Sequence, residues 1–228
     1  MIYKFKKIIC FISAIGLSSF ANIACADTSF SLGLRAWDTQ WLSTDGSYSY
    51  GTGEKRLVIG SVSAKFDNLI VFGSYSPEAV YDFTEAGWGK PKRKESDINV
   101  GYSVHPYISI SLGIKSISQK WDVTPVDTIV DFRATTIGLS AAAPIPETSL
   151  FMFGSAAFGP VKATSNNASW AIESNGLYGS TDFGMGYSLS SAFKLTMSYR
   201  YQHVPYVFQG VKVQDNTSGI ALGGIVTF

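Results

Sequence analysis

The two histidines are the side chains of this chain best suited to acid–base chemistry near neutral pH. His105 stands directly before Pro106, where a turn is the expected conformation. His203 would need a nearby nucleophile or carboxylate to act in a hydrolase, but position 205 is Pro and position 201 is Tyr. The G-x-S-x-G, H-E-x-x-H and phosphate-loop motifs do not occur in the sequence. The sequence therefore predicts no catalytic site, no metal site and no cofactor.

Four charged residues lie on segments in which apolar and polar side chains alternate, and they are Asp97, Lys115, Asp182 and Arg200. An acid and a base of this set can form an ion pair only if the segments that carry them pair in the right register. A shift of one residue turns every side chain of a strand to the other face. The strands and turns around these residues therefore decide which ion pairs are possible.

Alternation with a period of two residues runs through the chain after residue 26 and is typical of β-strands. In 177–189, for example, Phe183 and Met185 share one face, while Asp182 and several glycines occupy the other. The same part of the chain contains no convincing amphipathic helix. Ten strands are expected, at approximately 29–41, 55–66, 69–77, 93–104, 108–121, 128–141, 149–158, 175–189, 193–204 and 217–228. Eight or twelve strands are the alternatives, but ten fit the length best.

The connections between these strands alternate in length. The long ones are 42–54, 78–92, 122–127, 159–174 and 205–216, and the short ones are 66–68, 105–107, 142–148 and 190–192. Long outer loops that alternate with short periplasmic turns are typical of bacterial outer-membrane barrels. A soluble β-sandwich has no reason to alternate so regularly. The pattern therefore favours an all-β fold, an antiparallel up-and-down transmembrane barrel.

The composition agrees with such a barrel. Hydrophobic residues make up 46% of the chain and charged residues 15%, against about 25% charged residues in soluble domains. After residue 26, however, no apolar run reaches the roughly 18 residues that a membrane helix needs. A barrel explains both facts, because only alternate residues of its strands face lipid.

The segment 1–26 has the three parts of a secretory signal peptide. Three lysines precede the apolar stretch 8–20, and Ala24-Cys25-Ala26 forms an A-x-A cleavage site. A membrane anchor or a lipoprotein acylated at Cys25 are the alternatives. Cleavage removes both cysteines, so the predicted barrel domain, 27–228, contains no disulfide. It also removes three lysines, and the slightly acidic remainder excludes a basic nucleic-acid binder.

The last segment of the chain ends on Phe228 after Ile220 and Leu222 at alternate positions. It resembles the closing strand of bacterial outer-membrane proteins, in which a terminal aromatic residue is read by the barrel-assembly machinery. Gly224 interrupts the apolar face, and Val226 stands where those proteins often have Tyr. The resemblance implies that Phe228 is an assembly signal.

The strand pattern of the whole segment 27–228, with phrases such as Ser198-Tyr199-Arg200-Tyr201-Gln202, resembles the small outer-membrane barrel superfamily that includes the transmembrane domain of outer membrane protein A. The resemblance implies a monomer in the bacterial outer membrane, in contact with membrane lipid and lipopolysaccharide. It does not identify a function, because that superfamily contains many.

Some small barrels of this kind are enzymes, and His203 is the histidine whose surroundings bear on that possibility. Lipid A deacylases carry His-x-Ser, and omptin-type proteases carry Asp-x-His. Here Pro205 and Tyr201 replace the residue that would do the chemistry. We therefore expect that the protein is not an enzyme. An outer-membrane enzyme such as a lipid A deacylase is the least favoured of the alternatives.

Two ion pairs are expected inside the barrel. With three residues in each turn, the hairpin of the eighth and ninth strands sets Asp182 opposite Arg200, and that of the fourth and fifth sets Asp97 opposite Lys115. Inward charges are costly unless they are paired. Barrels of about eight strands have interiors that side chains just fill. We expect a mostly filled lumen and a structural or surface-interaction role, with a small diffusion pore or transporter as the alternative.

Aromatic and basic residues gather in one long loop, 78–94, where they are Tyr81, Phe83, Trp88, Lys90, Lys92, Arg93 and Lys94. This set is the predicted contact surface for lipopolysaccharide phosphates or a host surface. The plainer alternative places the lysines at lipid headgroups and the aromatic residues at the membrane interface. Other aromatic residues near strand ends are expected in interfacial girdles, and they are Trp37, Trp41, Tyr75, Tyr107, Trp121, Tyr187, Tyr199 and Tyr201.

Overall fold

The computed structural model describes residues 28–83, 90–122, 127–174 and 176–228, and these ranges form a ten-stranded antiparallel barrel with two additional short strands. The barrel strands are β1 (Thr28–Thr44), β3 (Lys55–Phe66), β4 (Leu69–Val80), β5 (Lys92–His105), β6 (Ile108–Trp121), β7 (Thr128–Pro144), β8 (Leu150–Ser165), β10 (Leu177–Ser188), β11 (Phe193–Phe208) and β12 (Val211–Thr227). The predicted signal peptide, 1–26, lies outside the described residues. In the part of the chain that the structure describes, no helix is long and apolar enough to span a membrane.

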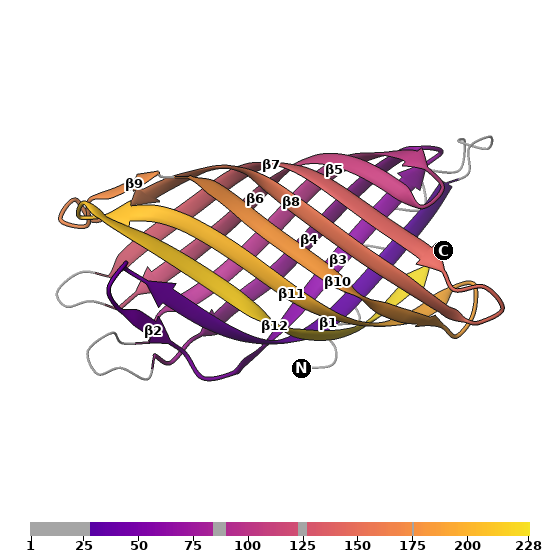
Figure 1. Ribbon diagram of the computed structural model, residues 1–228, viewed down its shortest axis with the longest axis horizontal. Coiled ribbons are helices and arrows are strands. Elements are labelled where there is room, and N and C mark those ends of the chain that lie inside the picture. The colour runs from indigo at the N-terminus through magenta and orange to yellow at the C-terminus, as the bar shows by residue number, and fades with distance from the viewer. Residues whose placement is uncertain (1–27, 84–89, 123–126, 175) are drawn as a thin grey trace, which may run out of the picture.

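Each barrel strand pairs with the strands on either side of it in the chain, and β1 closes the barrel by pairing with β12. The pairing runs from Ser31 opposite Thr227 to Thr44 opposite Gln214. The short strands β2 (Ser49–Gly51) and β9 (Ile172–Ser174) pair with β1 and β11. Both lie at the end of the barrel opposite the C-terminus, as Figure 1 shows. The chain therefore follows the predicted up-and-down order.

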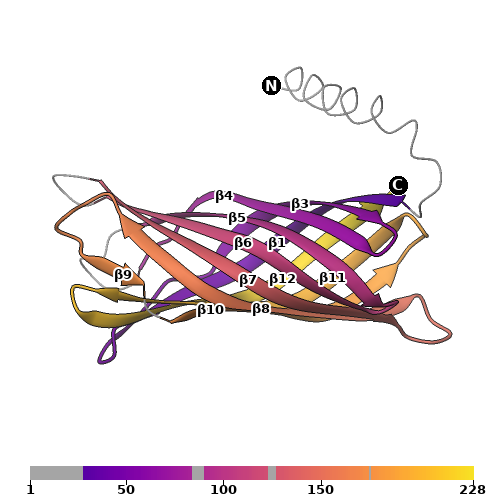
Figure 2. The same ribbon diagram turned by 90° about the horizontal axis from the view of Figure 1, so that it is seen from above.

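The two ends of the barrel differ, and Figures 1 and 2 show the strands inclined between them. At one end, here called the turn end, β1 begins, β12 ends, and short turns join the strands at 67–68, 106–107, 145–149 and 189–192. The other end, here called the loop end, carries the longer connections and the two short strands. This asymmetry confirms the predicted alternation of long loops and short turns at four of the five connections that were expected to be long.

The prediction of a long loop is wrong for one connection. The segment 205–216 belongs mostly to β11 and β12, which continue to a two-residue turn at Gln209-Gly210. Both turn residues have positive φ, 49° and 81°, as a type I′ hairpin turn requires. Pro205 lies within β11, opposite Gln214. In the same way β8 extends beyond the predicted end at residue 158, to Ser165.

The outward residues of the strands form an apolar band. Ile98 on β5, Leu112 on β6 and Ile137 on β7 are 64%, 62% and 56% exposed, and their strands are adjacent in the sheet. Contiguous apolar surface of this kind is expected where lipid covers it. The tyrosines at 75, 107, 187, 199 and 201 lie on the outside, as a girdle requires, and their place at the membrane interface stays a prediction.

The predicted girdle position is wrong for Trp37, Trp41 and Trp121, which are at most 7% exposed and belong to the core inside the barrel. Alternation shows which residues of a strand share a face. It does not show which face points to lipid when both carry large apolar residues, as in β1, where Leu32 and Leu34 point outward and the tryptophans inward.

The core lies in the loop-end half of the lumen. On β6 the inward residues are fully buried from Lys115 to Trp121, whereas Ser109, Ser111 and Gly113, nearer the turn end, are only partly buried. The loop-end half therefore holds the barrel's internal packing and is the place to look for a functional site.

Candidate functional site

A connected set of aromatic rings crosses the lumen at the loop end. We call this set the aromatic cap, and its members are Trp41, Tyr81, Phe83, Trp121, Trp170 and Phe208. The ring of Trp41 lies 5.4 Å from that of Tyr81 and 5.8 Å from that of Trp121. Trp170 continues the set, 6.1 Å from Trp121 and 5.1 Å from Phe208. Edge-to-face and offset contacts in this distance range are favourable, so the cap joins β1, β6 and β11 from inside.

The segment after β4 supplies two rings of the cap. Tyr81 and Phe83 are 1% and 6% exposed, and Phe83 forms an isolated β-bridge with Thr52. Thr52 also accepts a hydrogen bond at its hydroxyl from the Trp41 backbone, at 3.0 Å. Burial raises the pKa of the Tyr81 phenol, so this ring stays neutral. The segment is thus folded into the barrel mouth and held there by β1 and its neighbours.

Beneath the cap lies a buried ion network made by Arg93, Glu95, Lys115 and Gln202. Glu95 accepts hydrogen bonds from Arg93 Nε at 2.9 Å, Lys115 Nζ at 2.7 Å and Gln202 Nε2 at 3.1 Å. Arg93 Nη2 also donates to Gln202 Oε1 at 3.2 Å. None of the four residues is more than 5% exposed. Burial of charges is tolerated where they are paired and hydrogen-bonded, and the Glu95 carboxylate meets that condition.

Two further contacts tie this network to its surroundings. The Arg93 guanidinium lies 5.2 Å from the centre of the Trp41 ring, within the range of a cation–π interaction. Asp215 on β12 is fully buried and accepts a hydrogen bond from Gln119 Nε2 at 2.8 Å. The buried carboxylic acids at 95 and 215 match the buried cations at 93 and 115 in number.

No protein-family model matches the chain. No curated protein matches it in sequence. Among solved structures, the outer membrane protease OmpT from Escherichia coli is similar with a TM-score of 0.61 at 9% identity, over 91% of this chain and 99% of that one. Neisserial surface protein A aligns with a TM-score of 0.43 at 14% identity, over 87% and 97% of the two chains. OprG from Pseudomonas aeruginosa aligns with a TM-score of 0.43 at 10% identity, over 90% and 96%.

The fold is that of a bacterial outer-membrane β-barrel. Together with the apolar outer band, this fold agrees with the predicted location in the bacterial outer membrane. In such barrels the short turns face the periplasm and the longer loops face outward, so the aromatic cap lies at the outer mouth. At 9% identity the likeness to the protease concerns the fold alone.

The register predicted for the two hairpins of this outer-membrane barrel is confirmed. Asp182 lies opposite Arg200, and Asp97 lies opposite Lys115. The ion pairs predicted from that register are wrong, because the side chains bind other partners. Lys115 binds the diagonal neighbour Glu95, and the Asp97 carboxylate accepts a hydrogen bond from Asn99 Nδ2.

Asp182 also has a different partner from the predicted one. Arg35 Nη1 on β1 donates to its carboxylate at 2.5 Å, although β12 and β11 lie between β1 and β10 in the sheet. Arg200 instead lies over the Trp37 ring, 5.0 Å from its centre. Inward side chains of a closed barrel can meet across the lumen, so the directly opposite residue is not always the nearest. Alternation on 93–104 could have indicated Glu95 as an inward partner for Lys115. The contact between Arg35 and Asp182 could not be predicted in this way, because it depends on the closed barrel.

The predicted contact surface in 78–94 is wrong for Tyr81, Phe83 and Arg93, which are buried in the lumen. Alternation along β5 is the reason, because it turns Arg93 inward and its neighbours Lys92 and Lys94 outward. Trp88 lies outside the described residues. Lys90 forms an ion pair with Asp82 at 3.0 Å, and Lys92 forms one with Asp122 at 3.8 Å. Of the predicted basic cluster, Lys94 is exposed on the outer wall.

Neither histidine lies in the lumen. His105 is exposed at the turn end, where its Nδ1 accepts a hydrogen bond from the Tyr107 backbone at 3.3 Å. His203 lies on the outward face of β11, where Nδ1 is 2.8 Å from Asn216 Oδ1. Its partner is therefore an amide, which also accepts a hydrogen bond from the Tyr201 hydroxyl at 2.7 Å.

Phe228 lies at the turn end with its side chain 73% exposed. Its backbone exchanges hydrogen bonds with that of Phe30, at 2.8 and 3.2 Å. The last residue thus continues the seam between β1 and β12, and its role as an assembly signal stays a prediction.

Proposed function

We propose that this protein is a closed, non-conducting barrel with a structural role in the outer membrane, where it presents its loop end to the outside. The observation that carries the proposal is the aromatic cap together with the buried ion network, which occupy the lumen at the outer mouth. A ten-stranded barrel is close in size to barrels whose interiors side chains fill, and aqueous channels are found nearer sixteen strands.

The charges of the lumen support a closed barrel over a pore. An ion path needs hydrated polar groups, whereas Glu95 is hydrogen-bonded to three donors and is 5% exposed. The two buried cations of the network, Arg93 and Lys115, are matched in number by two buried carboxylates, Glu95 within the network and Asp215 beside it, so the mouth has no surplus of buried charged side chains to attract a permeating ion. These features fit a core that fixes the shape of the outer mouth.

Planar bilayer recordings of the purified, folded protein test this proposal. The wild type is expected to give no stable conductance steps. A variant that combines Trp41→Ala, Phe83→Ala and Trp121→Ala should give steps, because it removes the centre of the aromatic cap. The matched control combines Val100→Ala, Leu112→Ala and Ile137→Ala on the lipid-facing side and should remain silent.

A heat-modifiable gel shift confirms that each variant is folded before the recordings. Large, stable steps from the wild type would show that solutes pass the cap and would favour the diffusion pore. A silent cap variant that is folded and inserted would show that something other than the cap closes the lumen.

A further inference from the structure

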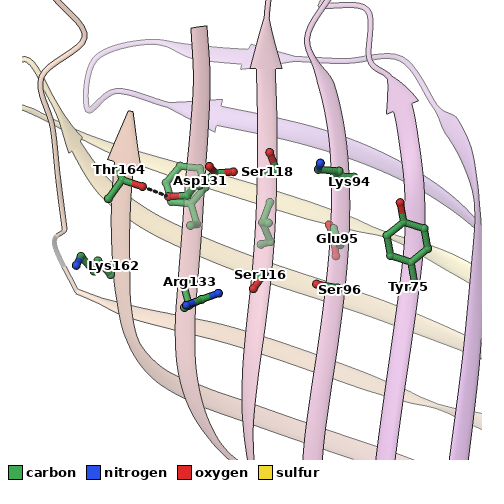
Figure 3. A pocket seen from close by; sticks show the side chains of 12 residues that line it. Tyr75, Lys94, Glu95, Ser96, Ser116, Ser118, Asp131, Arg133, Lys162 and Thr164 are labelled. Atoms are coloured by element: carbon green, nitrogen blue, oxygen red, sulfur yellow. Dashed lines mark hydrogen bonds between the residues drawn. The ribbon is translucent and has the colours of Figure 1, made fainter. Parts of the chain in front are cut away.

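A hollow of about 610 Å³ lies on the outside of the barrel near the loop end, across β4 to β8. Figure 3 shows the side chains that line it on adjacent strands. We call it the outer groove, and the residues that the argument uses are Lys94, Ser96, Ser116, Ser118, Arg133 and Lys162. The groove belongs to the wall of the barrel rather than to the lumen.

Small side chains make the floor of the outer groove. Ser96 on β5 lies directly opposite Ser116 on β6, and Ser118 lies opposite Lys94. The three serines are partly buried between longer side chains. Their hydroxyls can donate to an acceptor that enters the hollow, so the floor is polar although the wall below it is apolar.

Three exposed cations, Lys94, Arg133 and Lys162, surround this floor. Arg133 lies directly opposite Lys162 across β7 and β8, and like charges in that position destabilise a sheet. The ion pairs formed within the described ranges include neither of these residues nor Lys94. Two acids, Asp131 and Glu95, also line the groove. Glu95 points into the lumen, where it binds Arg93 and Lys115, so Asp131 is the acid that faces the three cations and the charge on the outer face stays positive.

Other cations at the loop end are arranged differently. Lys90 pairs with Asp82, Lys92 with Asp122, and Lys120 with Asp127 at 2.6 Å. Asp82, Asp122 and Asp127 therefore lie beside these lysines, whereas the outer groove has Asp131 beside its three cations. A bound anion would relieve the repulsion that remains in the groove.

The height of the three cations on the barrel indicates where such an anion would lie. Each cation follows the last strongly exposed apolar residue of its strand by four positions toward the loop end, in the pairs Ile98 and Lys94, Ile137 and Arg133, and Phe158 and Lys162. Four residues span about 13 Å along a strand, or about 10 Å along the axis of a barrel with a strand tilt of about 40°. Flexible Lys and Arg side chains can reach part of that distance back toward the membrane. The cations therefore lie at the level of lipid headgroups in the outer leaflet.

We propose that the outer groove binds the phosphorylated sugar headgroup of lipopolysaccharide. From β5 to β8 the cations spread over three strand spacings, about 14 Å, which suits a headgroup with more than one phosphate better than a single phosphodiester. Clusters of Lys and Arg at membrane level are a known means of recognising anionic lipid headgroups. The proposal does not depend on whether the lumen conducts.

Lipid binding to the full-length, folded protein in detergent micelles tests this proposal, with bisphosphorylated lipid A as the probe and native mass spectrometry as the measurement. A variant that combines Lys94→Gln, Arg133→Gln and Lys162→Gln should bind lipid A about 100-fold more weakly, since each cation near a lipid surface contributes about fivefold. The matched control combines Lys90→Gln, Lys92→Gln and Lys120→Gln. It removes the same charge from paired lysines and should bind within about threefold of the wild type.

Two further probes separate the sources of phosphate. Dephosphorylated lipid A should bind the wild type as weakly as bisphosphorylated lipid A binds the groove variant, and free pyrophosphate should bind far more weakly than the lipid. The proposal is overturned if the groove variant, shown to be folded by its heat-modifiable gel shift, keeps wild-type affinity. It is also overturned if the control variant loses as much as the groove variant, or if free pyrophosphate binds as tightly as lipid A.

Discussion

The two halves of the lumen are enclosed by the same ten strands of the described chain but are lined by different residues. In the turn-end half, serine and glycine predominate, and β6 contributes Ser109, Ser111 and Gly113, which are partly buried. In the loop-end half, the same strand contributes Lys115 and Trp121, which are buried among charged and aromatic partners. The change occurs within a few residues of one strand, so it reflects the choice of inward side chains and not the backbone.

The difference shows where this barrel can build a specific core. Lipid requires apolar residues on the outside of the membrane band, and backbone pairing is alike from strand to strand. Only the inward face is free to carry tight tertiary packing, and here it does so at the outer mouth. We therefore expect the two halves to respond very differently to similar substitutions.

The largest difference is expected between two carboxylates that are neighbours on the inward face of β5. Glu95→Gln removes the acid that binds Arg93 and Lys115 and should lower the free energy of unfolding by about 3 to 5 kcal/mol, because two buried cations lose their counter-charge. Asp97→Asn, nearer the turn end, should cost about 1 kcal/mol or less, since Asp97 accepts its hydrogen bond from Asn99 and is only partly buried. Urea unfolding in micelles, followed by tryptophan fluorescence, measures both. Equal losses of stability from the two substitutions would contradict this prediction, because they would mean that water screens charges equally in both halves of the lumen.

A smaller contrast is expected for two inward phenylalanines. Phe132 is 2% exposed and lies 5.0 Å from the Tyr206 ring, so Phe132→Ala should cost about 3 kcal/mol. Phe72, in the turn-end half, is only partly buried, and Phe72→Ala should cost about 1 kcal/mol because less apolar area returns to water. The same unfolding assay compares them. A larger loss of stability from Phe72→Ala would show that the stabilising core lies in the turn-end half and would contradict the prediction.

The strands and their register could be predicted from the sequence because both depend on local signals. Alternation identified β5 and β6, and an expected three-residue turn placed Asp97 opposite Lys115. The observed turn has two residues, and an irregularity between Ser103 and His105 restores the predicted register at Asp97. The turn end was easier to predict than the loop end, because its connections are short and their length sets the register. The hairpin at Gln209-Gly210 lacked the Asn-Gly or Asp-Gly pair that marks a type I′ turn.

The candidate site was harder to predict because its contacts join distant parts of the chain. Arg35 and Asp182 meet only when the barrel is closed. Lys94 belongs with Arg133 and Lys162 only through the pairing of β5 to β8. Arg93 could have been assigned from the sequence. It is four residues before Asp97 and therefore shares its inward face, but its place in a polar segment favoured the surface interpretation.

The contact between Arg35 and Asp182 leads to a prediction of intermediate size. A double-mutant cycle with Arg35→Gln and Asp182→Asn should give a coupling energy of about 1 kcal/mol, because both side chains are mostly shielded from water, at 21% and 16% exposure. The cycle that combines Asp182→Asn with Arg200→Gln should give almost none, since Arg200 lies over Trp37 instead. A stronger coupling to Arg200 would restore the ion pair predicted from the register alone.

The smallest effect is expected for a pair of similar geometry on the outside of the barrel. Arg56 donates two hydrogen bonds to Asp38, at 2.7 and 2.8 Å, and the two side chains are 71% and 42% exposed. Water and salt screen such a pair, so the coupling between Arg56→Gln and Asp38→Asn should be smaller than that between Arg35 and Asp182 and should vanish in high salt. The lumenal pair should keep most of its coupling under the same conditions. If the outer pair, with the better hydrogen-bond geometry, couples more strongly and resists salt, then enclosure inside the barrel is not what strengthens the lumenal contacts.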